Sequence, residues 1–136
     1  MSPTLTIAID FDGTIVENKY PKIGKPLLFA FETLKKLQND GHNLILWTYR
    51  KGSRLEEAVT FCKKNGINFY AVNKSYPEEN FDKSLSRKIM ADIFIDDRNI
   101  GGMLGWGEIY QIISDKTGSK NPRQFKKKKS RFFGRL

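Results

Sequence analysis

Short apolar runs alternate with amphipathic segments along most of the chain. The runs are typical of buried strands, and they lie at 5–9, 44–47, 67–72 and 92–95. The segments between them carry apolar residues three and four positions apart, which is the spacing of one helix face. Strands that alternate with helices favour an α/β fold with a central parallel sheet and right-handed crossovers.

Helices are predicted between and after these strands. The first runs from Leu27 to Asn39 and stops before Gly41, a residue type that commonly ends a helix. The second begins at the capping-box pattern Ser53-Arg54-Leu55-Glu56 and continues to about Gly66. The rest of the pattern consists of a polar loop at 73–80, a short helix at 81–88 and a last helix at 106–113.

Polar side chains suited to phosphate chemistry follow three of the predicted strands. They are Asp10 and Asp12 after the first strand, Thr48 after the second, and Asp96 with Asp97 after the fourth. The carboxyl ends of parallel strands share one edge of the sheet, and ligands bind there near the point where the strand order reverses. Carboxylates this close repel each other unless they share a cation or a proton. The sequence therefore predicts one acidic site assembled from separate strands.

The segment Asp10-Phe11-Asp12-Gly13-Thr14, followed in order by Thr48, Lys88 and Asp96-Asp97, resembles the four motifs of the haloacid dehalogenase-like hydrolase superfamily. The likeness covers residues 5–113. Most members of that superfamily are phosphatases. The resemblance implies a Rossmann-like three-layer sandwich, a magnesium ion, and hydrolysis of a phosphomonoester through an aspartyl-phosphate intermediate.

The resemblance gives each motif residue a role that suits its chemistry. Asp10 would be the nucleophile that attacks phosphorus. Asp12 would protonate the leaving oxygen and then accept a proton from the hydrolytic water. Thr48 would donate a hydrogen bond to a phosphoryl oxygen, and Lys88 would neutralise the phosphoryl charge, with Lys83 as the alternative lysine.

Magnesium is the expected cofactor because it prefers a few carboxylate and carbonyl oxygens together with water and substrate phosphate. The expected ligands are Asp10, the main-chain carbonyl of Asp12 and Asp96. Asp97 is expected either to bind the ion as well or to lie directly behind its ligands.

Further residues near the predicted crevice are candidates for substrate binding. Gly13 and Thr14 suit a tight turn whose backbone N–H groups face a bound anion. Arg50 and Arg98 follow motif residues, and each is expected either to contact the substrate or to pair with a carboxylate. His42 precedes a strand in a polar turn, so it is expected to be exposed and without a role.

The intervals between the motifs are too short for the cap domain that many members of the superfamily carry. Only 33 residues separate Thr14 from Thr48, and 39 separate Thr48 from Lys88. The predicted elements fill both intervals. A capless catalytic domain over 1–115 is therefore expected, with a crevice open to large substrates, or to small ones if a neighbouring subunit covers it.

The charge of +9 lies in one part of the chain. Residues 1–115 contain 15 Lys and Arg and 15 Asp and Glu, whereas residues 116–136 contain nine Lys and Arg and no acid. The second segment predicts a flexible basic tail that makes weak, salt-sensitive contacts with nucleic acid or anionic lipid, or that docks on the protein's own body. Nucleic-acid end phosphatase is therefore an alternative function, with the tail as tether.

Two alternatives do not involve turnover. One is a phosphoacceptor signalling domain, although such receivers place the phosphoacceptor aspartate after a middle strand, where this chain has Thr48. The other is an inactive binding domain, against which the complete motif set argues.

Length and cysteine usage bound the cellular setting. At 136 residues the chain has room for one domain, and no apolar run approaches the roughly 20 residues that a membrane span requires. The chain begins directly on a predicted strand, and its single cysteine excludes an internal disulfide, so a cytoplasmic location is expected. Cys62 lies on the apolar face of the second predicted helix and is expected to be a core thiol.

Overall fold

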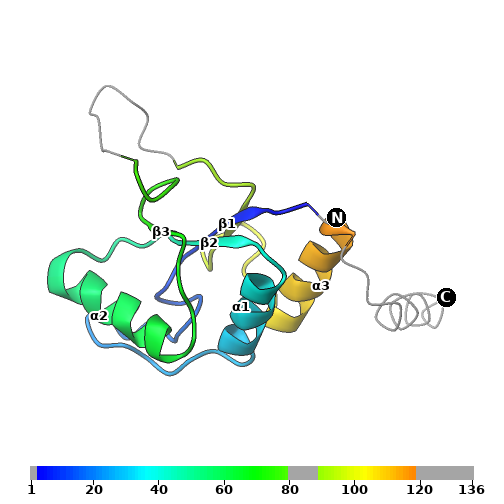
Figure 1. Cartoon of the computed structure of the whole chain (residues 1–136). Helices are drawn as coiled ribbons and strands as arrows, with labels where there is room; N and C mark the ends of the chain where they lie inside the picture. Colours follow the sequence, from blue (N-terminus) through cyan, green and yellow to red (C-terminus); the bar gives the residue numbers. More distant parts are fainter. Residues whose placement is uncertain (1–2, 80–88, 119–136) are drawn as a thin grey trace.

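The structure is a computed structural model that describes residues 3–79 and 89–118. Its strands form one parallel sheet in the order β3-β2-β1-β4 (Figure 1). Their bounds are Thr6–Ile9 for β1, Asn43–Leu46 for β2, Ala71–Val72 for β3 and Ile93–Ile95 for β4. The predicted α/β, Rossmann-like fold with a central parallel sheet is therefore confirmed.

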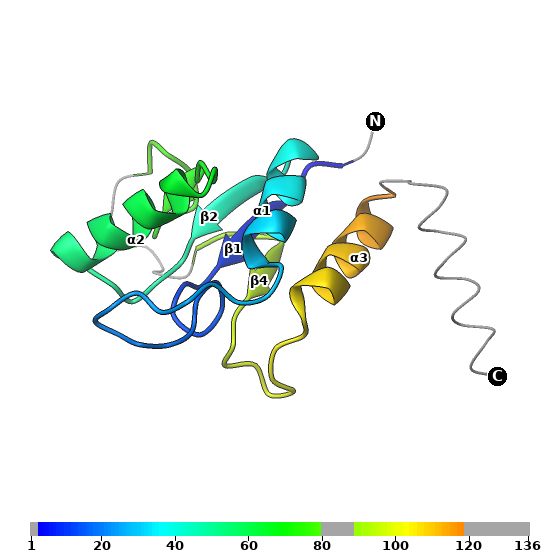
Figure 2. The same ribbon diagram turned by 90° about the horizontal axis from the view of Figure 1, so that it is seen from below.

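Three helices are described, and each follows one of these strands. Their bounds are Ala30–Asn39 for α1, Gly52–Lys64 for α2 and Trp106–Thr117 for α3. All three lie on the same face of the sheet, with α3 beside α1 (Figures 1 and 2). Within the described ranges, no helix is long and apolar enough to cross a membrane.

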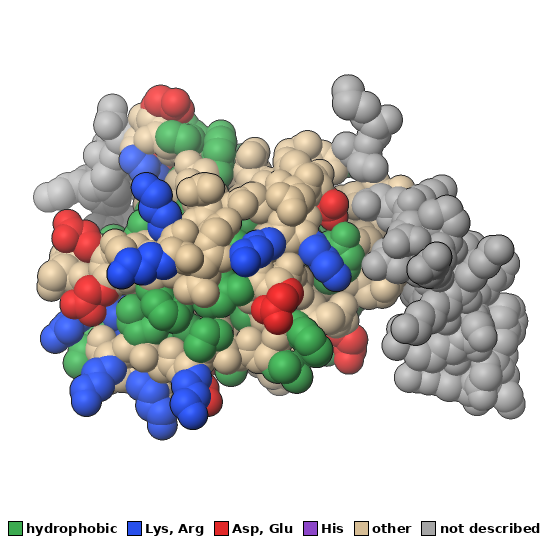
Figure 3. All heavy atoms as spheres, turned by 60° about the horizontal axis from the view of Figure 1, so that its bottom comes forward, with side chains coloured by type: hydrophobic (Ala, Val, Ile, Leu, Met, Phe, Trp, Pro, Cys, Tyr) green, Lys and Arg blue, Asp and Glu red, His purple; other side chains and the backbone are tan. Residues whose placement is uncertain are grey.

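The core lies on both faces of the sheet, as the nearly continuous apolar strands require. On the helix-covered face, Ile7, Ile9 and Leu44 are fully buried or nearly so against the apolar sides of the helices. On the opposite face, Ala8 and Ile45 are equally buried. Burying each of the larger side chains stabilises the fold by about 1.5–3 kcal/mol. Outside the core, charged side chains of both signs surround small groups of hydrophobic side chains on the face shown in Figure 3.

The register of the sheet determines which residues leave it together. Ile9 of β1 pairs with Leu46 of β2 on one side and with Ile95 of β4 on the other. The residues that follow these three positions therefore leave the sheet at the same level. The chain adds β2 and β3 on one side of β1 and then returns to place β4 on the other, so the strand order reverses between β1 and β4.

Several predicted boundaries differ from those observed. The first helix begins at Ala30 rather than Leu27, because Phe29 takes a left-handed φ of 64° and acts as the N-cap. The capping-box prediction at Ser53 is wrong: α2 begins one residue earlier, and its N-cap, Lys51, makes no side-chain capping bond.

β3 and α3 also differ in length from the predicted elements. The third strand shrinks to Ala71–Val72, since the Asn68 amide donates to the side chain of Gln38 at 2.7 Å instead of to β2. The last helix extends beyond its predicted end to Thr117 and stops at Gly118, which has a left-handed φ of 64°.

Two side chains with no predicted role are buried. His42 was expected to be exposed, but it is only 6% exposed, and its Nδ1 accepts a hydrogen bond from the Leu5 amide at 3.0 Å. That contact ties the start of the chain to the turn before β2, and burial lowers the pKa of His42. Cys62 is a core thiol, as predicted, and burial raises its pKa to about 12.

Candidate active site

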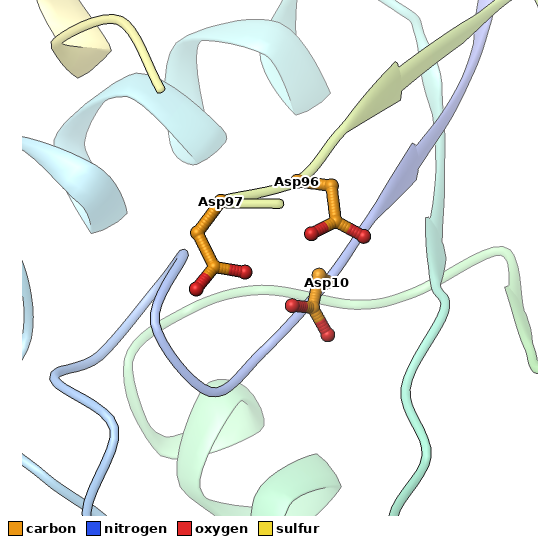
Figure 4. A group of neighbouring side chains, drawn as sticks. All are labelled: Asp10, Asp96 and Asp97. Carbon is orange, nitrogen blue, oxygen red and sulfur yellow. The ribbon is translucent and has the colours of Figure 1, made fainter. Parts of the chain in front are cut away.

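Three carboxylates meet where the strand order reverses. Asp10 follows β1, and Asp96 and Asp97 follow β4. One ligand oxygen from each lies within 4.8 Å of the others. Figure 4 shows the three groups turned toward one shared space at the ends of these strands. We call this group the acidic triad. The sequence predicted that these residues lie together, and the structure places them so.

The triad makes ionisation of Asp10 unfavourable. Asp10 is only 9% exposed, and its pKa is raised to about 7. Burial is the largest cause, and the charges of Asp96 and Asp97 raise the pKa further, against the effect of a hydrogen bond from the Phe11 backbone. A bound cation would offset both causes of this shift, because it supplies the opposite charge that the buried carboxylate lacks.

Asp97 carries the clearest sign that the triad suits a cation. Its Oδ1 is buried and has no hydrogen-bond partner among the described residues. A buried carboxylate oxygen without a partner is costly, and a metal ion is one of the few groups that satisfies it. Three carboxylates with no nearby imidazole or thiolate form a hard oxygen donor set. The triad can therefore hold a metal ion.

Gly13 gives Asp97 its space. A Cβ on Gly13 would overlap Asp97 Oδ2, and the backbone there has a φ of +85°. A side chain at this position would therefore strain the backbone and displace the Asp97 carboxylate. Sequence analysis assigned Gly13 to an anion-binding turn, but its N–H donates to the Val16 carbonyl at 2.8 Å. The absence of a side chain at Gly13 lets the Asp97 carboxylate lie against the turn after β1.

Thr14 connects the two halves of the triad from beneath. Its side chain is fully buried. The Thr14 hydroxyl donates to Asp10 Oδ2 at 3.4 Å, and the Thr14 hydroxyl oxygen accepts the Asp97 main-chain N–H at 3.1 Å. Its carbonyl accepts the indole N–H of Trp106 at 2.9 Å, and its own N–H donates to the Phe11 carbonyl. These contacts correct the expectation that Thr14 binds substrate: it positions the carboxylates.

Asp12 lies apart from the triad in a buried ion pair. Both of its carboxylate oxygens accept 2.8 Å hydrogen bonds from Arg50, one from Nε and one from Nη2. The two side chains are completely buried. Asp12 was expected to bind metal through its main-chain carbonyl. That oxygen accepts none of the backbone hydrogen bonds of the turn that follows, so no such bond occupies it.

Arg50 uses all of its remaining N–H groups on backbone carbonyls. Nη1 donates to Pro21 and Arg54, both at 3.3 Å, and Nη2 donates to Lys22 at 3.0 Å. The guanidinium carbon lies 5.1 Å from the ring centroids of both Phe11 and Tyr20. Of the two roles left open for Arg50, the structure shows pairing with a motif carboxylate. The expectation of substrate binding is corrected, because no N–H remains for a substrate.

Thr48 is half-buried at the end of β2, beside the Asp12–Arg50 pair. Its main-chain N–H donates to Asn73 Oδ1 at 2.8 Å, and its hydroxyl oxygen accepts the main-chain N–H of Arg50 at 3.2 Å. Asn73 was not among the predicted site residues; it follows β3 directly and has a φ of 55°. A polar residue just after a strand at this edge of the sheet was the available signal.

Two other predicted residues have different outcomes. The Arg98 side chain is exposed, and its N–H donates to Asp96 Oδ1 at 2.9 Å, a turn that orients the Asp96 carboxylate. Lys88 and its alternative Lys83 lie outside the described residues.

A solved structure from Bacteroides thetaiotaomicron, described as a conserved protein coded by a locus of that organism, is similar to this chain along nearly its whole length. The two are 52% identical, the match covers 90% of this chain and 98% of the other, and the TM-score is 0.79. This chain belongs to the same family as that protein. The description of the relative names no activity. No protein-family model matches the chain, and no curated protein matches it significantly.

Proposed function

We propose that the protein is a magnesium-dependent phosphatase that hydrolyses a phosphomonoester through an aspartyl-phosphate on Asp10. The observation that carries this proposal is the acidic triad, with its partnerless Asp97 oxygen, at the edge of the sheet where α/β proteins bind ligands. A nucleophilic carboxylate and a phosphate repel each other, so this chemistry needs a cation at the triad.

Magnesium suits the donors that the triad offers. Asp10, Asp96 and Asp97 would hold it through carboxylate oxygens, together with the carbonyl of Asp12. When bound, the ion would neutralise charge on the phosphoryl oxygens and keep Asp10 ionised near neutral pH.

The proposed reaction has two displacements at phosphorus. In the first, an Asp10 oxygen forms a bond to phosphorus while the bond to the leaving oxygen breaks, and Asp12, which takes up a proton from solvent once one of its Arg50 bonds has lengthened, gives that proton to the leaving oxygen. In the second, a water oxygen attacks phosphorus, Asp12 accepts the water proton, and Asp10 is released with inorganic phosphate. Thr48 would stabilise the transferring group, because its hydroxyl hydrogen remains available while its oxygen accepts from Arg50.

Arg50 acts on this reaction through Asp12, as a positioning residue. Because both Asp12 oxygens accept from Arg50, one of these bonds has to lengthen before Asp12 exchanges a proton with a substrate. The ion pair fixes the Asp12 carboxylate, so that this carboxylate stays outside the metal-binding group of Asp10, Asp96 and Asp97.

The test is a screen of phosphorylated metabolites, nucleotides and nucleic-acid ends with magnesium and with chelator. We expect hydrolysis of at least one phosphomonoester that requires magnesium and falls by about a thousandfold or more in Asp10→Asn, which keeps the shape but not the nucleophile. Asp92→Asn is the matched control, since Asp92 is an exposed acid at the opposite end of β4. Full activity in Asp10→Asn, or indifference to chelator, would overturn the proposed mechanism.

A second candidate function keeps this chemistry and directs it to nucleic-acid ends. It is favoured by the nine cationic residues and the absence of acids in 116–136. Removal of this segment separates the two candidates, because only the second needs it to hold the substrate.

A further inference from the structure

Two half-exposed tyrosines stand next to the Asp12–Arg50 pair. Tyr20 lies in the loop between β1 and α1, and Tyr49 lies just after β2, between Thr48 and Arg50. Their ring centroids are 5.1 Å apart, with a tilt of 57° between the ring planes. Tyr20 is 46% exposed and Tyr49 is 51% exposed. Large aromatic side chains left open to solvent beside a buried charged group are a common feature of binding sites.

The loop that carries Tyr20 is fixed by the same arginine that holds Asp12. Arg50 donates to the carbonyls of Pro21 and Lys22, and its guanidinium lies under the Tyr20 ring at 5.1 Å. Figure 2 shows this β1–α1 segment running close to the start of α2. Tyr20 is therefore positioned before any ligand arrives, and such preorganisation lowers the entropic cost of binding.

Tyr49 immediately precedes Arg50, the residue whose guanidinium holds both oxygens of Asp12. Burial and the charge of Asp12 raise the pKa of its phenol, and Asp10 adds a smaller contribution in the same direction. In the proposed reaction Asp12 faces the leaving oxygen, so the surface beside Asp12 is where the leaving group lies. The described residues between Thr14 and Thr48 and between Thr48 and 79 contain no inserted cap, so residues of these loops are the available contacts for that group.

We infer that Tyr20 and Tyr49 form a stacking surface for the leaving group, and that the substrate is a phosphomonoester carrying a nucleobase. This inference rests on the proposed phosphatase function. Tyrosine suits the task, because its ring offers a rigid apolar face while its hydroxyl remains in water. Stacking on aromatic side chains accepts any base, so the surface selects the class of substrate rather than one base.

The experiment compares ligands that differ only in the base. A nucleoside 5′-monophosphate and ribose 5-phosphate share the phosphate and the sugar, and a 5′-phosphorylated oligonucleotide places the same chemistry at a chain end. The measured quantity is the ratio of kcat/KM for the nucleotide to kcat/KM for ribose 5-phosphate. We expect the wild-type enzyme to favour the nucleotide. The value of kcat/KM for the oligonucleotide shows whether mononucleotides or chain ends are the better substrates.

Three variants make the test specific. Tyr49→Leu, which fills the space without a π-face, should lower the ratio roughly tenfold, whereas Tyr49→Phe should keep it. Tyr70→Ala should also keep it, because Tyr70 is a 39% exposed tyrosine that precedes β3 at the opposite edge of the sheet. An unchanged ratio in Tyr49→Leu would overturn the inference. If kcat/KM falls equally for both substrates, the ratio is unchanged, and Tyr49 merely supports Arg50.

Binding measured by calorimetry separates this inference from the proposed function. If no phosphomonoester is hydrolysed, the proposed function fails, and the affinities for the nucleotide and for ribose 5-phosphate still decide the matter. Tighter binding of the nucleotide that Tyr49→Leu removes would support the stacking surface. Equal affinity for both ligands in the wild-type protein would overturn it.

Discussion

Asp10 and Asp12 stand two residues apart, yet the fold gives them opposite surroundings. Asp10 faces two further carboxylates, and its pKa is raised to about 7. Asp12 faces a buried guanidinium that binds both of its oxygens at 2.8 Å. A strand would place residues two apart on the same side, but the chain turns after Phe11, whose carbonyl accepts from the Thr14 and Ile15 N–H groups, and Asp12 therefore points toward Arg50 in the loop after β2.

In the proposed reaction, the contrast between these two aspartates would let one short motif supply two roles. A carboxylate surrounded by acids needs a cation, and with one it becomes a nucleophile held against a neutralised phosphate. A carboxylate held by an arginine is fixed in position, and it can exchange a proton when a substrate draws one oxygen away. Environments that differ this strongly between neighbouring carboxylates are typical of catalytic pairs. Each aspartate's surroundings can be altered separately, and the expected effects differ in size.

The largest effect on stability is expected from breaking the Asp12–Arg50 pair. Arg50→Met leaves a buried carboxylate without its partner and should lower the free energy of unfolding by about 3–5 kcal/mol. Adding Asp12→Asn to Arg50→Met should recover part of that loss, because no buried charge then remains. Urea denaturation of the two single variants and the double variant measures the coupling.

Arg54→Met is the matched control for this prediction. Arg54 pairs with Glu57 at 3.3 Å, but both side chains are nearly half exposed, so the loss should be about 0.5 kcal/mol or less. Equal losses in Arg50→Met and Arg54→Met would contradict the central place given to the buried pair.

The Asp12–Arg50 pair also shows where sequence reasoning stops. The meeting of Asp10 with Asp96 and Asp97 could be predicted, because parallel strands bring their carboxyl ends to one edge whatever the details of the loops. Whether Arg50 contacts a substrate or pairs with a carboxylate could not be predicted from the sequence. It depends on the carbonyls of Pro21 and Lys22, whose loop path has no periodic pattern in the sequence.

The other errors have a similar origin in contacts between distant segments. The start of β3 was predicted too early in the chain because a Gln38 side chain, 30 residues away, takes the Asn68 amide. Thr14 was assigned to the substrate because it follows Gly13 in a tight turn whose backbone N–H groups suit a bound anion. Its burial under α3 depends on Trp106, which lies 92 residues further on.

The second prediction tests the surroundings of Asp10, through the pH dependence of stability without metal. The raised pKa of Asp10 means that the native protein keeps a proton that the unfolded chain has released above about pH 4. Stability in chelator should therefore fall as the pH rises from about 4 to 7, by on the order of 4 kcal/mol, and the loss should remain above pH 7. Thermal melts across this range measure it.

Asp10→Asn is the control that isolates this contribution. His42 acts in the opposite direction: its lowered pKa adds stability as the pH rises toward 6.5, and the variant retains that contribution. Asp10→Asn should be more stable than wild type at pH 8 in chelator. Magnesium at 100 times its dissociation constant should stabilise wild type by about 2.7 kcal/mol and the variant by less. A variant that is less stable than wild type at pH 8 would contradict the unfavourable ionisation assigned to Asp10.

The third prediction concerns the close approach of Gly13 to Asp97. Gly13→Ala forces an L side chain into a left-handed backbone, which costs about 1–2 kcal/mol, and the new methyl group also displaces the Asp97 carboxylate. Gly41→Ala carries the backbone cost alone, since its φ is +94° and no atom lies within 4 Å of the added Cβ. Gly13→Ala should therefore be the less stable variant, and it alone should bind magnesium more weakly in a calorimetric titration. Equal magnesium affinities in the two variants would mean that Asp97 is not needed for the ion.

The smallest effect on the folded body is expected from removing residues 120–136. The acidic triad and the Asp12–Arg50 pair use residues between 10 and 97, and α3 ends at Thr117, so the truncated chain keeps every contact described for the site. Turnover of a small phosphomonoester and the melting temperature should change little.

Polyanion binding should respond differently to the same truncation. Eight of the nine cationic residues beyond Asp115 lie in residues 120–136 and are removed with them. For every phosphate that the protein no longer neutralises, the dependence of log affinity on log salt should fall by about 0.9 on duplex DNA and about 0.7 on single strands. Titrations of both chains with a nucleic acid over a salt series measure these slopes.

Equal affinity at every salt concentration would remove the case for a tethered nucleic-acid end phosphatase. A collapse of small-substrate turnover would instead make the tail part of the site. A drop in salt dependence with unchanged turnover would place recognition of the polyanion in the tail and the chemistry at the end of β1.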